Sequence, residues 1–151
     1  MRKATPSLRD RALACLTRRE YSRQELHRKL SVFAGEDDDL DGLLDEFQQR
    51  GWISDARYAD QMVHARKGKF GSLKVAHELR AQGVAEELVE KAVAEVRDAE
   101  PETARALWRK KFGSAPASRE EWAKQARYLQ GRGFGMETIR SVLRDGAPDD
   151  E

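Results

Sequence analysis

The feature that most constrains the fold is an internal repeat with a spacing of about 50 residues. Five apolar positions recur in three successive stretches of the chain, first 49 and then 50 positions later. The three sets are Leu13, Leu30, Leu40, Leu43 and Leu44; Met62, Leu79, Val89, Ala92 and Val93; and Phe112, Leu129, Ile139, Val142 and Leu143. Since only 39% of the residues are hydrophobic, a complete match is far from chance. A repeat of this length is typical of stacked units that bury their apolar faces against one another.

Apolar residues spaced three and four apart predict that each unit is helical. Leu40, Leu43, Leu44 and Phe47 show this spacing, and no Val/Ile/Thr alternation typical of strands occurs. Ser22 with Glu25, and Ser118 with Glu121, form capping-box patterns that start helices. The predicted helices are 7–19, 22–32, 37–50, 55–67, 72–82, 85–98, 101–113, 118–131 and 135–144.

These helices fall into three groups of three, so we predict an all-α fold. It is a tandem repeat of three three-helix modules, elongated or curved. The predicted units are 1–53, 54–100 and 101–144, followed by an acidic tail, 145–151. Gly83 and Gly133 occupy equivalent turns, whereas module one has Ala34 there, so its turn should differ. Modules of about 50 residues are marginal alone and should lean on their neighbours.

Bulk properties exclude several classes of protein. The 151 residues contain no apolar run long enough for a membrane span, and Cys15 is the only cysteine. No Cys/His spacing suits zinc, so we expect neither metal nor cofactor. The expectation is a cytoplasmic monomer without membrane association.

The near-neutral formal charge of +1 hides an alternation along the chain. Residues 1–35 carry +6 and 36–60 carry −7; residues 61–83 carry +4, 84–102 carry −5 and 103–144 carry +7. Stacked modules could therefore present one basic and one acidic stripe. A basic stripe suits a phosphate backbone, while an acidic one suits a basic protein surface.

Candidate contact residues follow from these stripes. For nucleic acid they are Arg18, Arg19, Arg23, Arg28, Lys29, Arg66, Lys67, Lys69, Lys74, Arg109, Lys110, Lys111, Arg127 and Arg132. For a protein partner they are Glu36, Asp37, Asp38, Asp39, Asp41, Glu86 and Glu87. The competing interpretation is that both sets are solvated helix faces.

No catalytic constellation can be assembled from local spacing. Cys15 lies between apolar neighbours, and His27, His64 and His77 have charged neighbours on helices. The glycines at 68–72 and 131–135 complete neither GxxxxGK[ST] nor GxGxxG. We therefore predict that the protein is not an enzyme.

Three segments carry a family resemblance over about residues 8–144. LTRREYSRQELHRKL at 16–30, FQQRGWISDARYADQMV at 47–63 and HELRAQGVAEELVEKAV at 77–93 resemble the RecX family. The resemblance implies a tandem three-helix-repeat protein that binds the RecA recombinase filament and restrains its ATPase, DNA pairing and strand exchange. It implies a role in homologous recombination, DNA repair and the SOS response, and no catalytic residues.

The charge pattern and the resemblance to the RecX family support one hypothesis, in which the chain lies along the RecA–DNA filament. The basic stripe would face DNA, single-stranded or also duplex, and the acidic stripe would face RecA. Two alternatives remain: a helix-turn-helix-like DNA-binding regulator and a helical protein-interaction adaptor.

Overall fold

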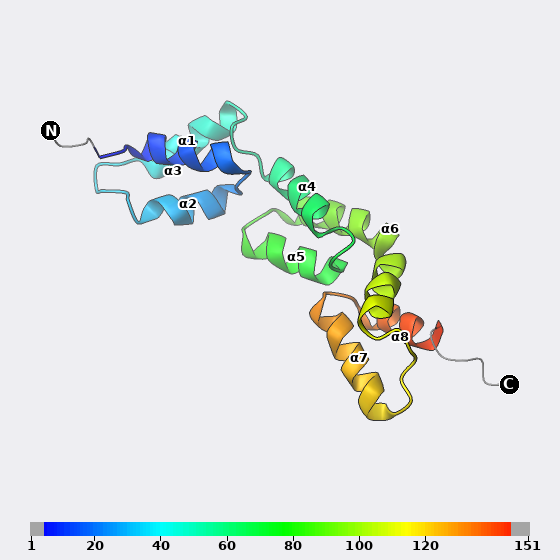
Figure 1. Ribbon diagram of the computed structural model, residues 1–151. Coiled ribbons are helices and arrows are strands. Elements are labelled where there is room, and N and C mark those ends of the chain that lie inside the picture. Colours follow the sequence, from blue (N-terminus) through cyan, green and yellow to red (C-terminus); the bar gives the residue numbers. More distant parts are fainter. Residues whose placement is uncertain (1–4, 146–151) are drawn as a thin grey trace.

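The computed structural model describes residues 5–145, and every regular element in that range is helical. Eight helices follow one another in an elongated, bent arrangement with the two ends of the chain far apart (Figure 1). They are α1 (Leu8–Arg18), α2 (Arg23–Ser31), α3 (Leu40–Gln49), α4 (Asp55–Arg66), α5 (Ser72–Ala81), α6 (Glu86–Lys111), α7 (Arg119–Gly131) and α8 (Met136–Asp145). The prediction of an all-α tandem repeat is confirmed.

Side-chain caps explain where most of these helices begin. The hydroxyls of Ser22, Ser54 and Ser118 each accept a hydrogen bond from the backbone N–H three residues later. Such a cap satisfies a donor that the first helical turn leaves unpaired. The caps predicted at Ser22 and Ser118 are confirmed. By contrast, α5 follows Gly71, which has no side chain to cap with.

The repeated apolar positions build three separate hydrophobic clusters along the chain. The first contains residues between Ala12 and Ile53, the second between Tyr58 and Val96, and the third between Ala104 and Leu143. All fifteen repeat positions lie in these clusters or pack against them. We call the three helix groups built around them modules one, two and three. Their predicted boundaries at 53 and 100 stay a prediction.

The separation of helices 85–98 and 101–113 is wrong. Both belong to α6, which runs without interruption through Pro101 and joins modules two and three. Proline fits a first turn, but inside a helix it removes one N–H and its ring crowds the carbonyl four residues back. Figure 1 shows α6 changing direction along its length, as an internal proline would cause. The helix can continue because α6 packs against α4 and α5 at one end and α8 at the other.

The predicted acidic tail, 145–151, lies outside the described residues except for Asp145, the last residue of α8. Between residues 5 and 145, no helix combines the length and the apolar character needed to cross a bilayer.

Candidate nucleic-acid and partner interface

Neighbouring modules meet at two junctions, and at both a donor from the start of a second helix reaches the backbone carbonyl at an equivalent position of the next module. At the first junction, between modules one and two, the Ser22 hydroxyl donates to the carbonyl of Gln82 at 2.8 Å. At the second junction, between modules two and three, the Gly71 N–H donates to the carbonyl of Arg132, also at 2.8 Å. Ser22 and Gly71 are 49 positions apart, and Gln82 and Arg132 are 50 apart. The repeat therefore extends from the cores to the contacts between modules.

Each junction also places a carboxylate on a helix N-terminus, from module two at the first junction and from the shared helix α6 at the second. At the first junction, Asp55 accepts from the Arg23 N–H at 2.8 Å. At the second, Glu100 accepts from the Ser72 N–H at 2.8 Å and from the Ser72 hydroxyl at 3.1 Å. A carboxylate at this end pairs free N–H groups and complements the helix dipole. These caps tie the second helix of one module to the first helix of the next.

Cations gather around an aromatic ring at the second junction. The Phe70 ring centroid lies 4.4 Å from Lys74 Nζ, 5.1 Å from Arg132 Cζ and 5.4 Å from Arg66 Cζ. These distances fall within the range of cation–π attraction. Arg132 also donates to the backbone carbonyl of Lys69 at 3.5 Å. The loop before α5 and the turn after α7 are thus held together by their basic residues.

A second ring continues this arrangement into module three. Tyr128 lies 5.7 Å from Arg132 Cζ and 5.7 Å from Lys111 Nζ, and its ring meets Phe112 edge-on. We call the set Arg66, Lys69, Lys74, Lys111 and Arg132, with these rings, the second-junction cation cluster. Within this set only Arg66 has a carboxylate partner in the described chain, Glu78 at 3.0 Å. Aromatic faces hold Lys74, Lys111 and Arg132 in place but do not neutralise them, so their N–H donors are available to a phosphate.

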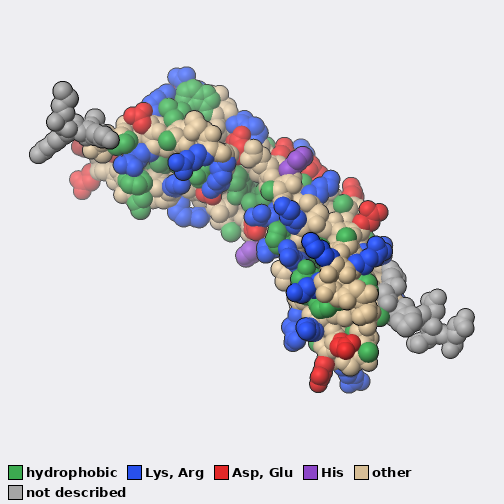
Figure 2. Space-filling view, viewed as in Figure 1, with side chains coloured by type: hydrophobic (Ala, Val, Ile, Leu, Met, Phe, Trp, Pro, Cys, Tyr) green, Lys and Arg blue, Asp and Glu red, His purple; other side chains and the backbone are tan. Residues whose placement is uncertain are grey.

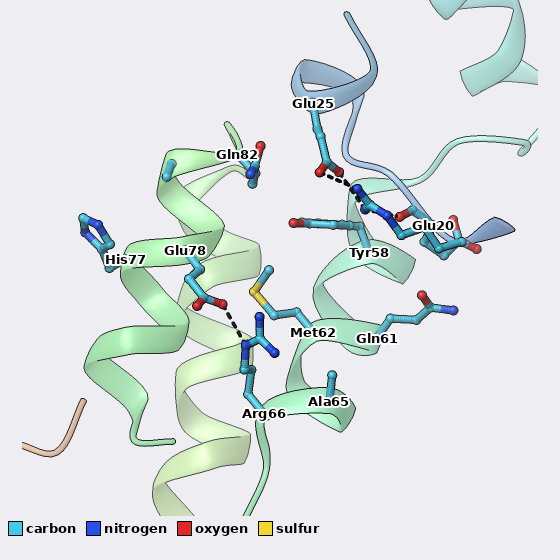
Figure 3. A pocket seen from close by; sticks show the side chains of 12 residues that line it. Glu20, Glu25, Tyr58, Gln61, Met62, Ala65, Arg66, His77, Glu78 and Gln82 are labelled. Carbon is cyan, nitrogen blue, oxygen red and sulfur yellow. Dashed lines mark hydrogen bonds and ion pairs between the residues drawn. The ribbon is translucent and has the colours of Figure 1, made fainter. Parts of the chain in front are cut away.

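The first junction differs, because two of its arginines are paired with acids. Arg19 makes two hydrogen bonds to Glu25, at 2.8 and 3.0 Å, and these raise the pKa of Arg19 above its usual value. Arg57 donates to Glu20 at 2.9 Å. Figure 3 shows Glu25 close to Tyr58, whose pKa burial raises above its usual value of 10.0. A phosphate that approached Arg19 or Arg57 would therefore compete with a carboxylate.

Comparison with known proteins shows which family the chain belongs to. The sequence profile of the second three-helix domain of RecX matches residues 54–93, and that of the third three-helix domain matches residues 98–143. Regulatory protein RecX of Chromobacterium violaceum is 45% identical over 144 residues, which cover 95% of this chain and 93% of that protein. The chain belongs to the RecX family. A second RecX relative, from Neisseria gonorrhoeae, is 39% identical over 142 residues and is covered to 92% of its length.

The fold of the RecX-family chain also matches a solved structure. The crystal structure of RecX from Lactobacillus salivarius superposes with a TM-score of 0.73 over 91% of this chain and 93% of that one. At 18% sequence identity this likeness concerns the fold alone. The resemblance to RecX predicted from the sequence is confirmed by the domain profiles and the sequence relatives.

The structure distributes the predicted nucleic-acid residues of this RecX-family protein unevenly. Three of them are paired with carboxylates: Arg19 with Glu25, Arg23 with Asp45, and Arg66 with Glu78. At the first junction, Arg28 reaches the Ala81 carbonyl at 3.4 Å, and Lys29 reaches the Tyr21 hydroxyl at 3.3 Å. Exposed cations without a described ion pair are Arg18, Arg28, Lys29, Lys67, Lys69, Arg109, Lys110, Lys111 and Arg127. Figure 2 shows Lys and Arg side chains over the middle of the molecule and along module three.

The predicted partner-binding acids serve partly local roles. Asp38 accepts from the Gly35 N–H, and Asp39 caps α3 through the Gly42 N–H at 3.0 Å. Asp41 lies 3.4 Å from His27 Nε2, and Glu86 pairs with Arg80, which lowers the pKa of Glu86. Exposed acids outside these contacts are Glu36, Asp37 and Glu87. Their partner role stays a prediction.

The contacts at the two junctions were not predicted from the sequence. Comparing the repeats residue by residue would have found them, since Ser22 and Gly71 fall opposite one another, as do Gln82 and Arg132. Phe70 is half-buried and has three cations around its ring, two of them from elsewhere in its own module and one from module three. Over the part of the chain that the structure describes, no group of three or more His, Cys, Asp or Glu residues could hold a metal ion.

Proposed function

We propose that this RecX-family protein is a cytoplasmic regulator of RecA in recombinational DNA repair. It binds the RecA–DNA filament as a monomer and restrains RecA ATPase activity, filament growth and strand exchange. Family membership supports the regulatory role, and the charge distribution supports contact with DNA in the filament. The protein performs no chemistry itself in this proposal.

The observation that carries the DNA contact is the second-junction cation cluster. Lys74, Lys111 and Arg132 come from three different elements and converge on two rings without a carboxylate partner. Preorganised cations of this kind suit a phosphate backbone, because binding need not first break an ion pair. Exposed Lys69 and Arg127 extend the basic surface on either side. Single-stranded DNA is the proposed ligand.

RecA ATPase activity on single-stranded DNA tests the proposal. The protein is titrated from well below one molecule per recombinase, at a salt concentration that abolishes its direct binding to DNA. We expect inhibition at substoichiometric amounts, because a regulator that acts along a filament affects many subunits. No inhibition at any ratio would exclude filament regulation and leave the adaptor or DNA-binding alternatives.

A further inference from the structure

The first junction forms a cavity, open to solvent, that the proposed DNA contact does not use. It has a volume of about 640 Å³ and lies between the loop joining α1 to α2 and the helices α4 and α5. Tyr58 and Met62 supply apolar surface on one side, while Glu78 and Gln82 reach it from α5 and the turn that follows (Figure 3). An apolar wall with a few polar groups is typical of a binding site.

Carboxylates dominate the polar groups of the cavity. Glu20, Glu25 and Glu78 line it against two guanidinium groups, those of Arg19 and Arg66. Glu78 accepts from Arg66 through Oε2 at 3.0 Å, and its Oε1 has no described donor. The lining thus carries one carboxylate more than it has guanidinium groups, and this charge balance favours a cation over a phosphate.

Gln82 supplies a further acceptor without a donor. Its backbone carbonyl receives the Ser22 hydroxyl, but its side-chain Oε1 is buried and has no hydrogen-bond partner in the described chain. Buried polar atoms are nearly always paired in folded proteins, so an unpaired one at a cavity wall points to a donor from outside.

We propose that this cavity receives a lysine or arginine side chain from a protein partner. The aliphatic stem lies along Tyr58 and Met62, and the cationic head donates to Gln82 Oε1 and Glu78 Oε1. Charge complementarity selects this occupant over DNA. The inference rests on the proposed function, in that the partner is the RecA filament. It assigns the first junction to protein and the second to nucleic acid.

Binding to RecA filaments on single-stranded DNA tests the inference, at a salt concentration that abolishes direct DNA binding. Glu78→Gln removes charge from the cavity, and Ala65→Lys fills it with a cation from this chain, since Ala65 is exposed and lines the cavity. We expect each to weaken filament binding about tenfold or more, the effect of losing one charge-assisted contact. Glu90→Gln and Ala94→Lys make the same charge changes at exposed positions of α6 and should bind as the wild type does.

The outcomes separate the inference from the proposed function. If the wild-type protein binds filaments and both cavity variants bind equally well, the inference is wrong and the function stands. If the wild-type protein does not bind filaments at all, the proposed function fails and the inference falls with it. Thermal unfolding of each variant shows whether a loss of binding reflects a loss of fold.

A crosslinking measurement identifies the occupant directly. Gln61 is exposed at the edge of the cavity, so a photoreactive p-benzoylphenylalanine can replace it without disturbing a core. We expect mass spectrometry to place the adduct within a few residues of a lysine or arginine of the partner and to tell the two apart. Adducts with DNA, or with an acidic segment of the partner, would overturn the inference.

Discussion

The two junctions are built alike and charged differently. In both, the start of a second helix donates to the carbonyl in the helix–helix turn of the next module, and a carboxylate caps the same helix. Positions facing the junctions nevertheless differ in charge. The equivalent pairs are Glu20 and Lys69, Glu25 and Lys74, Glu78 and Tyr128, and Gln82 and Arg132. Backbone contacts thus fix how modules stack, and side chains at repeated positions determine what each junction can bind.

Replacing the junction glycines by alanine should produce the largest difference in lost stability between the two junctions. Gly83 and Gly133 both have positive φ, 74° and 95°. A Cβ on Gly133 would lie 2.4 Å from Lys74 Cβ and 2.7 Å from Lys74 N, whereas one on Gly83 would meet chiefly the flexible side chain of Gln24. We expect Gly133→Ala to cost roughly 2–4 kcal/mol of unfolding free energy, from backbone strain plus overpacking.

Gly83→Ala is the matched control for that substitution, with a smaller expected loss of about 1–2 kcal/mol, because its Cβ overlaps only the side chain of Gln24, which can shift, and no backbone atom. Urea-induced unfolding of the two variants provides the measurement. Equal losses would show that close packing at the second junction adds nothing to the strain common to both positions.

Removing the junction carboxylates should cause the next largest loss of stability. Glu100 is only 7% exposed, so Glu100→Ala leaves the donors of Ser72 unpaired and should cost about 1–3 kcal/mol. Asp55 is half-buried, so Asp55→Ala should cost nearer 0.5–1 kcal/mol, as for the loss of an ordinary helix cap.

Chemical unfolding again measures both losses, and Glu102→Ala on the exposed side of α6 is the control. A Glu100→Ala protein as stable as the wild type would show that its contact with Ser72 does not hold modules two and three together.

Exchanging charges between the junctions should alter DNA binding. Lys69→Glu with Lys74→Glu gives the second junction the residues that stand at the equivalent positions, Glu20 and Glu25, of the first. We expect affinity for single-stranded DNA to fall on the order of tenfold, about 1.4 kcal/mol. The log–log salt dependence should flatten by about 0.7 for each lost phosphate contact.

Lys91→Glu with Arg97→Glu is the matched control, since both residues are exposed on α6 and the charge change is the same. Fluorescence anisotropy at several salt concentrations gives affinity and slope together. A slope unchanged in the Lys69/Lys74 variant would remove these lysines from the DNA contact.

The smallest expected effect is a pH dependence confined to the first junction. Burial raises the pKa of Tyr58 above 10.0, so the folded state holds this proton more tightly than the unfolded state. The resulting stability is complete below pH 10 and is lost as pH rises through the folded-state pKa. At the equivalent position of the second junction stands Trp108, which does not titrate.

Tyr58→Phe should therefore make the unfolding free energy less dependent on pH between about 9 and 11. Chemical unfolding at several pH values, followed by tryptophan fluorescence, checks this. The same alkaline loss in Tyr58→Phe as in the wild type would assign it to another group.

The sequence predicted the cores well because burial leaves a periodic signal. Leu30, Leu79 and Leu129 stand at one repeat position, and each is at most 1% exposed. Caps at Ser22, Ser54 and Ser118 were equally readable, since capping depends on residues three apart. Local rules thus sufficed for helices and cores.

Contacts between modules were harder to predict, because they depend on residues far apart in the chain. Glu100 had no local feature to mark it as the cap of Ser72, 28 positions earlier. Pro101 favoured a helix start by local rules, and packing on both sides overrode that preference. Charge blocks indicated a basic surface, but only the structure separates Arg19 and Arg23, paired with acids, from Lys74 and Arg132, held by aromatic rings.

Because α6 is uninterrupted, its length fixes how module three is rotated relative to module two. A helix turns about 100° per residue, so one residue inserted between Val96 and Ala104, which belong to the cores of modules two and three, would swing module three through that angle about the helix axis. Arg132 would then point away from Phe70. An insertion in the short segment between α3 and α4, outside any helix, could be absorbed by a change of loop conformation. Lengths should therefore vary far more freely between the first two modules than between the last two.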